Sequence, residues 1–190
     1  NASAQESVLS KIHLGIVTPI STQSRAAKHI SPVFSLHVLQ GVNKNNNGFS
    51  ISGMATTLYG SNRGVLISGL INHVNSSDKG VTIAGLYNHA NNGIGIQIAG
   101  LHNHQKGNGY IQIAGLSNSS KYSLMQVSGL VNISNHVHSQ FAGLINIAKT
   151  GKGVQFAGLI NIADSSDHPI GLLNFIKNGE QQLGIQIYDD

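Results

Sequence analysis

The chain has 190 residues, of which only 9% are charged and 5% are aromatic. Typical soluble domains carry roughly 25% charged residues, so neither ion pairs nor a large aromatic core can hold this fold together. The net charge is +4 and the eleven Lys and Arg residues are scattered along the chain, which argues against binding to nucleic acid. The chain has no cysteine, which excludes a disulfide scaffold and a thiolate metal site.

The first residues resemble a processed export signal. Ala2-Ser3-Ala4 followed by Gln5-Glu6 is similar to an A-x-A cleavage site, so we expect residues 1–6 to be a signal-peptide remnant with no fixed structure, and the protein to be exported. No apolar run approaches the ~18 residues of a membrane-spanning helix, so we expect the chain not to span a membrane itself.

Residues 7–47 do not fit the pattern that follows them. Residues 12–17 and 33–39 are predicted to be strands joined by a polar loop, because both are apolar and flank the polar segment from Ser21 to Ser31. A stack of repeats needs its end covered, so we interpret residues 7–47 as an N-terminal β cap.

Residues 48–190 consist of nine tandem copies of a unit of about 15 residues, centred on Gly-Leu-x-Asn. The glycines recur at intervals of 13 to 16 residues. Counting this glycine as position five, positions one and three are apolar, position two is mostly Gln, position six is Leu or Met, and position eight is Asn in eight units. The nine glycines are Gly53, Gly69, Gly85, Gly100, Gly115, Gly129, Gly143, Gly158 and Gly171.

The alternation of the unit predicts which side chains face inward. Apolar residues at positions one and three predict a strand whose inner face they form. The Leu at position six and the Asn at position eight are also expected to face inward, so the inward positions change from odd to even numbers within the unit. A bend at the glycine accounts for the change of parity, because glycine permits backbone angles that other residues avoid. Positions two, seven and nine are then expected to face solvent.

Two short strands, a corner and a polar turn describe one coil of a β-solenoid. We therefore predict an all-β, short-coil β-solenoid (β-helix) of about nine coils of ~15 residues. Variable turns explain the drift in the interval. The alternatives are a β-meander or a small β-barrel with one strand per unit, which the parity change and the absence of aromatic girdles disfavour.

The recurring Asn and Gly residues are assigned structural roles. Stacked coils place equivalent residues ~4.8 Å apart, so inward Asn amides can bond their neighbours in a ladder instead of leaving each amide unpaired at about 1–3 kcal/mol. The ladder residues are Asn72, Asn88, Asn103, Asn118, Asn132, Asn146, Asn161 and Asn174, and the corner residues include Gly69, Gly85, Gly100, Gly115, Gly129, Gly143 and Gly158.

The repeat motifs carry a family resemblance over nearly the whole chain. GVQFAGLINIA at residues 153–163, with GVLISGLIN and GVTIAGLYN starting at Gly64 and Gly80, resembles the bacterial surface-repeat proteins with GVQIGLxN-type tandem repeats. The resemblance implies export and a location at the cell surface, the outer membrane or the periplasm of Gram-negative bacteria. It implies no activity, and it transfers no functional residues.

The candidate sites are few. His73, His89 and His104 follow the ladder Asn in three successive units, and such a column could share a transition metal; a plain outward polar position is the simpler interpretation. The segment Asp164-Ser165-Ser166-Asp167-His168 holds Asp, Ser and His within one turn, which does not provide the separate, rigid elements that a catalytic triad needs.

We therefore expect a non-enzymatic protein without a cofactor. The favoured function is a rigid, exported repeat scaffold at the cell surface or in an envelope complex, whose partner is another envelope or surface protein. The alternative is a carbohydrate-binding or adhesion module that recognises a surface glycan, against which the isolated positions of Tyr87 and Tyr110 in the sequence argue.

Overall fold

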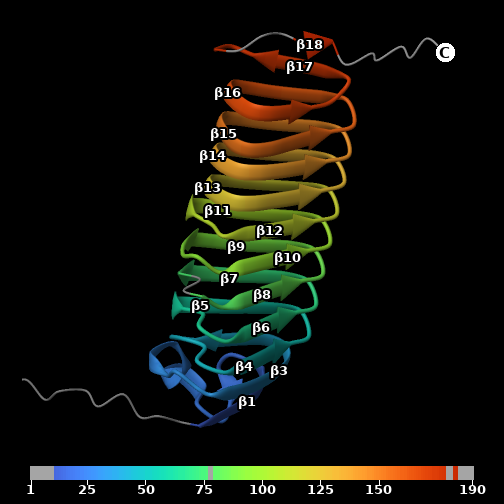
Figure 1. Ribbon diagram of the computed structural model, residues 1–190. Helices are drawn as coiled ribbons and strands as arrows, with labels where there is room; N and C mark the ends of the chain where they lie inside the picture. Colours follow the sequence, from blue (N-terminus) through green and yellow to red (C-terminus); the bar gives the residue numbers. More distant parts are fainter. Residues whose placement is uncertain (1–10, 77–78, 179–181, 184–190) are drawn as a thin grey trace, which may run out of the picture.

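A computed structural model describes residues 11–76, 79–178 and 182–183. It is a β-solenoid of about nine stacked parallel coils (Figure 1). The only helix among the described residues is the short 3-10 helix η1 (Ser24–His29). The predicted solenoid is confirmed, and the parallel pairing of strands one repeat apart is not that of a meander. The expected signal-peptide remnant, residues 1–6, lies outside the described residues.

Each coil contributes one strand to each of two parallel sheets. Positions one to four form the first sheet, which includes β4 (Phe49–Ser52), β6 (Val65–Ser68), β8 (Val81–Ala84), β10 (Ile96–Ala99) and β12 (Ile111–Ala114). Positions seven to ten form the second sheet, which includes β5 (Ala55–Ser61), β7 (Ile71–Ser76), β9 (Tyr87–Asn92) and β11 (His102–Asn108). Equivalent positions of neighbouring coils are paired, so the strands are in register.

The C-terminal coils are built from longer strands. Here one bent strand runs from the second sheet through the turn into the first sheet of the next coil, as in β13 (Ser117–Ser128), β14 (Val131–Ala142), β15 (Ile145–Ala157) and β16 (Ile160–Ile170). The stack ends with β17 (Leu173–Ile176), to which β18 (Gln182–Leu183) is antiparallel. Figure 1 shows the glycine corners along one long edge of the rod and the variable turns along the other.

The segment interpreted as a cap contains both expected strands. They are β1 (Ile12–Val17) and β3 (Phe34–Asn43), with β2 (Ile20–Ser21) and η1 between them. β1 pairs with β3 in parallel, and β3 pairs in parallel with both β4 and β5. Both strands thus join the same stack of coils as the repeats.

The prediction of which side chains point inward is wrong for positions one, two, three and six of the unit. Positions two, four, eight and ten are buried, whereas one, three, six, seven and nine face outward. Gln112 and Gln126 are 0% exposed, while Ile113 is 38% and Leu116 is 44% exposed. Side-chain parity therefore does not change at the corner. The even positions point inward on both sheets, and only the Leu at position six is turned outward by the bend.

The interior holds two ladders of amides beside two small apolar clusters, one that includes Leu66 and one that includes Val137. The Asn side chains bond from coil to coil over 2.8–3.1 Å, from Asn72 to Asn174. The Gln side chains form a second ladder over 2.8–2.9 Å, from Gln97 to Gln155. Because amides one coil apart bond one another, most of these polar groups are buried with partners. At the two ends of the Gln ladder, Gln97 Nε2 and Gln155 Oε1 lack a partner in the described structure.

The corner glycine is needed because successive coils approach closely. A Cβ atom added to Gly100 or Gly115 would lie 2.0 Å from the carbonyl oxygen of the corner glycine one coil earlier. None of the corner glycines has a positive φ; the only glycine with one among the described residues is Gly93. The predicted reason, unusual backbone angles, is therefore wrong, and the reason for glycine is lack of space.

Candidate functional site: an apolar surface, a basic edge and an aromatic cleft

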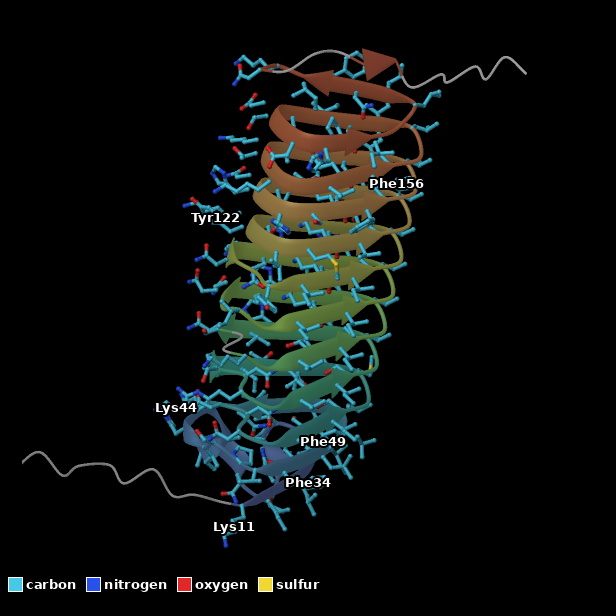
Figure 2. The ribbon with its side chains drawn as sticks, viewed as in Figure 1. Lys11, Phe34, Lys44, Phe49, Tyr122 and Phe156 are labelled. Carbon is cyan, nitrogen blue, oxygen red and sulfur yellow. The ribbon has the colours of Figure 1, made fainter. Side chains whose placement is uncertain are left out.

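The first sheet has an apolar outer face along the whole rod. Positions one and three carry Ile, Val, Leu, Phe or Met in nearly every coil. Each pairs in register with the equivalent position of the next coil, as Ile98 does with Ile113. Many are well exposed, including Phe49 at 37%, Phe141 at 37% and Phe156 at 48%. In Figure 2 the side chains of Phe34, Phe49 and Phe156 lie outside the ribbon. No charged residue occupies these two positions from β3 to β15.

The Leu or Met side chains at position six form a continuous corner ridge beside that face. All nine are between 36% and 47% exposed, because the bend turns them away from the interior. From Met54 to Leu159 the backbone N–H of each of these residues donates to the coil before it, as Leu116 does to the carbonyl of Leu101 at 3.0 Å. The corner ridge consists of Met54, Leu70, Leu86, Leu101, Leu116, Leu130, Leu144, Leu159 and Leu172.

The outer face of the second sheet changes character along the rod. In the N-terminal half it carries rings and hydroxyls, while from β14 onward positions seven and nine are apolar. Ile133, Ile162 and Phe175 are 45%, 41% and 47% exposed. The C-terminal coils therefore have apolar side chains on both sheet faces and on the ridge between them.

Charge is collected on the edge opposite the corner ridge. The turns of this basic edge carry eight exposed basic residues among the described residues, against the acids Asp164 and Asp167. Figure 2 shows Lys44 on this edge, across the rod from Phe156. Among the described residues, the basic residues of this edge are Lys44, Arg63, Lys79, Lys106, Lys121, Lys149, Lys152 and Lys177.

The predicted histidine column exists as a stack of rings on the second sheet. The ring centroids of His73 and His89 are 4.8 Å apart, those of His89 and His104 are 5.2 Å apart, and the rings are nearly parallel. Burial, followed by the charge of neighbouring His73, lowers the pKa of His89, and burial also lowers the pKa of His104. Within the described part of the chain, no group of three or more His, Cys, Asp or Glu side chains is placed to hold a metal.

An aromatic cleft of about 520 Å³ opens on the basic edge. Its walls include Tyr110, Tyr122, His136, His138 and Lys152. The Tyr122 ring stacks on His136 with centroids 4.8 Å apart, and the Lys121 ammonium lies 5.6 Å from the Tyr122 ring centre. A cleft with apolar walls and a few polar groups is the usual form of a small-ligand site.

The sequence analysis missed this cleft, although a signal was present. Tyr122 precedes His136 by one 14-residue repeat, so the in-register pairing of β13 with β14 brings the two rings together. Tyr110 comes from the preceding turn and is 46% exposed. The expectation that Tyr87 and Tyr110 are isolated is therefore wrong. Tyr110 lines the same cleft as Tyr122, and Tyr87 stacks on His102 with ring centroids 5.6 Å apart.

The Asp and His side chains of residues 164–168 do not form a catalytic triad. Residues 164–168 belong to the extended strand β16, and Asp164, Asp167 and His168 are all exposed. In the described structure no hydrogen bond joins either carboxylate to His168. An extended strand spreads these side chains along its length and does not bring a nucleophile and a base together.

No family model, no curated protein and no solved structure matches this chain. No helix among the described residues is long and apolar enough to cross a membrane. The site is therefore interpreted from its own geometry.

Proposed function

We propose that this protein is a non-enzymatic, exported scaffold at the cell surface or in the envelope, and that its apolar outer surface is the part that engages a partner. One observation carries the proposal: amide ladders and mostly small apolar side chains fill the interior, while large aliphatic side chains line the outside. Soluble monomers rarely expose contiguous apolar patches above a few hundred Å². A face two side chains wide and nine coils long, at ~4.8 Å per coil, lies at the upper end of this range, and the corner ridge beside it enlarges the apolar surface further.

The regularity of the surface supports a scaffold over a catalyst. The apolar columns repeat the same side chains from coil to coil, while catalysis needs a local arrangement of different groups. The rod is rigid because each coil bonds to both neighbours through backbone and side-chain ladders. Export and an envelope location are supported by the resemblance of the repeats to surface-repeat proteins.

The proposal is tested by removing the apolar ridge without touching the interior. We compare the purified chain with the triple variant Leu101→Gln, Leu116→Gln and Leu130→Gln, using binding of the dye ANS and sedimentation velocity. We expect the natural chain to bind ANS strongly or to self-associate, and the variant to lose most of either behaviour at an unchanged melting temperature. A natural chain that sediments as a monomer and binds no ANS would contradict the proposal.

A carbohydrate-binding function is the second candidate, and the aromatic cleft is the observation that favours it. Tyr110, Tyr122 and Lys152 offer ring edges, hydroxyls and a positive charge around one opening, which would suit an acidic saccharide. On a glycan array we expect Tyr122→Ala to abolish binding. Tyr59→Ala, which changes an exposed tyrosine on another turn, is the matched control. Absence of any bound glycan, or equal loss in both variants, would rule against this candidate.

A further inference from the structure

We infer that the partner of the apolar surface is the hydrocarbon of one leaflet of an anionic lipid bilayer, which the corner ridge enters while the basic edge stays among the headgroups. The inference rests on the proposed function and names its partner. It assigns the insertion to the C-terminal coils, residues 125–176, where both sheet faces and the ridge between them are apolar except for Ser139 and the exposed His168 at position one.

The shape of the apolar surface favours a fluid partner. Leu130, Leu144 and Leu159 stand on a convex edge, with Phe141 and Phe156 on one flank and Ile133 and Ile162 on the other. A flat protein face, including that of a second copy, covers only one flank of such an edge. Liquid hydrocarbon surrounds a convex edge and covers both flanks at once, which buries the most apolar area.

The width of the coil fits one leaflet. A strand of four residues, such as β12 or β17, spans about 13 Å at ~3.3 Å per residue. The hydrocarbon core of a bilayer is about 30 Å thick, so one leaflet contributes about 15 Å. With the ridge near the middle of the bilayer, the turns of the opposite edge would reach the headgroups.

The distribution of charge fits the same orientation. The basic edge carries Lys121, Lys149 and Lys152 beside the C-terminal coils, with Asp164 and Asp167 as the acids described there. Long lysine side chains reach the headgroups from the membrane boundary. The excess of basic residues along the whole described edge favours anionic over zwitterionic lipid.

The interior explains how a polar backbone would be tolerated in lipid. Hydrocarbon cannot bond exposed N–H and C=O groups, so these must be satisfied within the protein. Each coil between two others bonds its backbone to both neighbours, and the amide ladders are closed off from the outside, as the 0% exposure of Asn146 and Gln140 shows. The groups that would contact hydrocarbon on the outside of the C-terminal coils are therefore mainly aliphatic side chains.

The test is flotation of the full chain with vesicles of phosphatidylcholine, with or without phosphatidylglycerol. The ridge variant Leu130→Glu with Leu144→Glu is compared with the control Asn47→Glu with Asn108→Glu, which adds the same charge at exposed sites on the basic edge. Both variants lower the net charge equally, so a difference between them reports the position of the ridge. Circular dichroism and melting temperature verify that both variants fold.

We expect the natural chain to float with both vesicle types, several-fold better with phosphatidylglycerol, and the ridge variant to lose at least ten-fold in vesicle affinity relative to the control. Equal behaviour of the two variants would overturn insertion of the ridge. A natural chain that does not bind vesicles but self-associates through the ridge would overturn the lipid inference and would still agree with the proposed function. A chain that does neither would overturn both.

Discussion

Individual amides in the interior share the space inside the coils with small apolar clusters. Asn132 donates to the side chain of Asn146 at 3.1 Å and to the carbonyl of Phe141 at 2.8 Å, and it accepts from Asn118 at 3.0 Å. One side chain thus joins three coils. Removing it takes one hydrogen bond from each neighbour on the ladder: Asn118 Nδ2 keeps its bond to the carbonyl of Val127, but Asn146 Oδ1 loses its donor.

This predicts that Asn132→Leu is destabilising although it adds an apolar side chain to a buried site. We expect a loss of about 2–4 kcal/mol in the free energy of unfolding, measured by urea denaturation. The adjacent Ile133→Ser removes an exposed apolar side chain and should change stability by less than about 0.5 kcal/mol. The reverse order of the two effects would contradict the facing seen in the structure.

The corner glycines permit a second prediction at the scale of one atom. Gly115→Ala places a Cβ 2.0 Å from the carbonyl oxygen of Gly100, whereas at Gly109 the nearest atom is 3.4 Å away. The first change must separate two coils, so we expect Gly115→Ala to lower the melting temperature strongly and Gly109→Ala to leave it within a few degrees. Differential scanning calorimetry of both variants checks this, and similar melting temperatures would show that the coils are not in contact at the corner.

At the scale of elements, the N-terminal strands differ from the repeats by burying histidines. His13 on β1 and His37 on β3 meet edge to face with ring centroids 4.5 Å apart. His13 bonds Asn43 and Ser21, whereas both ring nitrogens of His37 lack a partner in the described structure. Burial, followed by the charge of His13, lowers the pKa of His37 to about 4. Burial also lowers the pKa of His13, and the bond to Asn43 partly opposes this effect.

These shifts predict that acid destabilises the β1–β3 end. Both folded-state pKa values lie below the ordinary 6.5, so the unfolded chain binds more protons in acid. The stabilising contribution is complete above about pH 6.5 and is lost as the pH falls toward 4. Melting curves across this range should decline less steeply for His37→Phe than for the natural chain. An unchanged pH dependence in the variant would assign the effect to other groups.

At the scale of the whole molecule, the stack is a row of nearly equivalent coils. Such proteins owe their stability to contacts between neighbours, and coils can be lost without changing the plan. Deletion of residues 131–144 removes one complete period and joins the corner at Leu130 to the strand that starts at Ile145, which has the same register. The remaining coils keep their ladder positions.

We expect this deletion variant to stay folded, with a β-sheet circular dichroism spectrum and a urea m-value lower by about a tenth, because m scales with the buried area. Deletion of residues 131–137 removes half a period and puts inward amides against outward side chains. That variant should fail to fold. If both deletions fold, or neither does, the coil is not the unit of the structure.

Asn132 and Gln126 show which features of the fold could be predicted from the sequence and which could not. The period, the coil, the corner at glycine and the burial of Asn132 all follow from spacing, because parallel in-register stacking is the arrangement that places identical residues together. The burial of Gln126 and the exposure of Leu130 were predicted the other way round. An alternating strand shows which residues share a face, but it does not show which face lies inside.

The sequence by itself therefore determined the repeat, the parallel stack and the Asn ladder, which depend on local spacing. The tertiary structure decided which face is buried, because a Gln amide becomes acceptable inside only when another lies one coil away and completes its hydrogen bonds. It also brought Tyr122 onto His136 and gathered the lysines on one edge, since both depend on the register between coils. Because the Gln face is buried, the aliphatic columns lie on the outer surface, and this apolar surface is the reason why lipid is proposed as the partner.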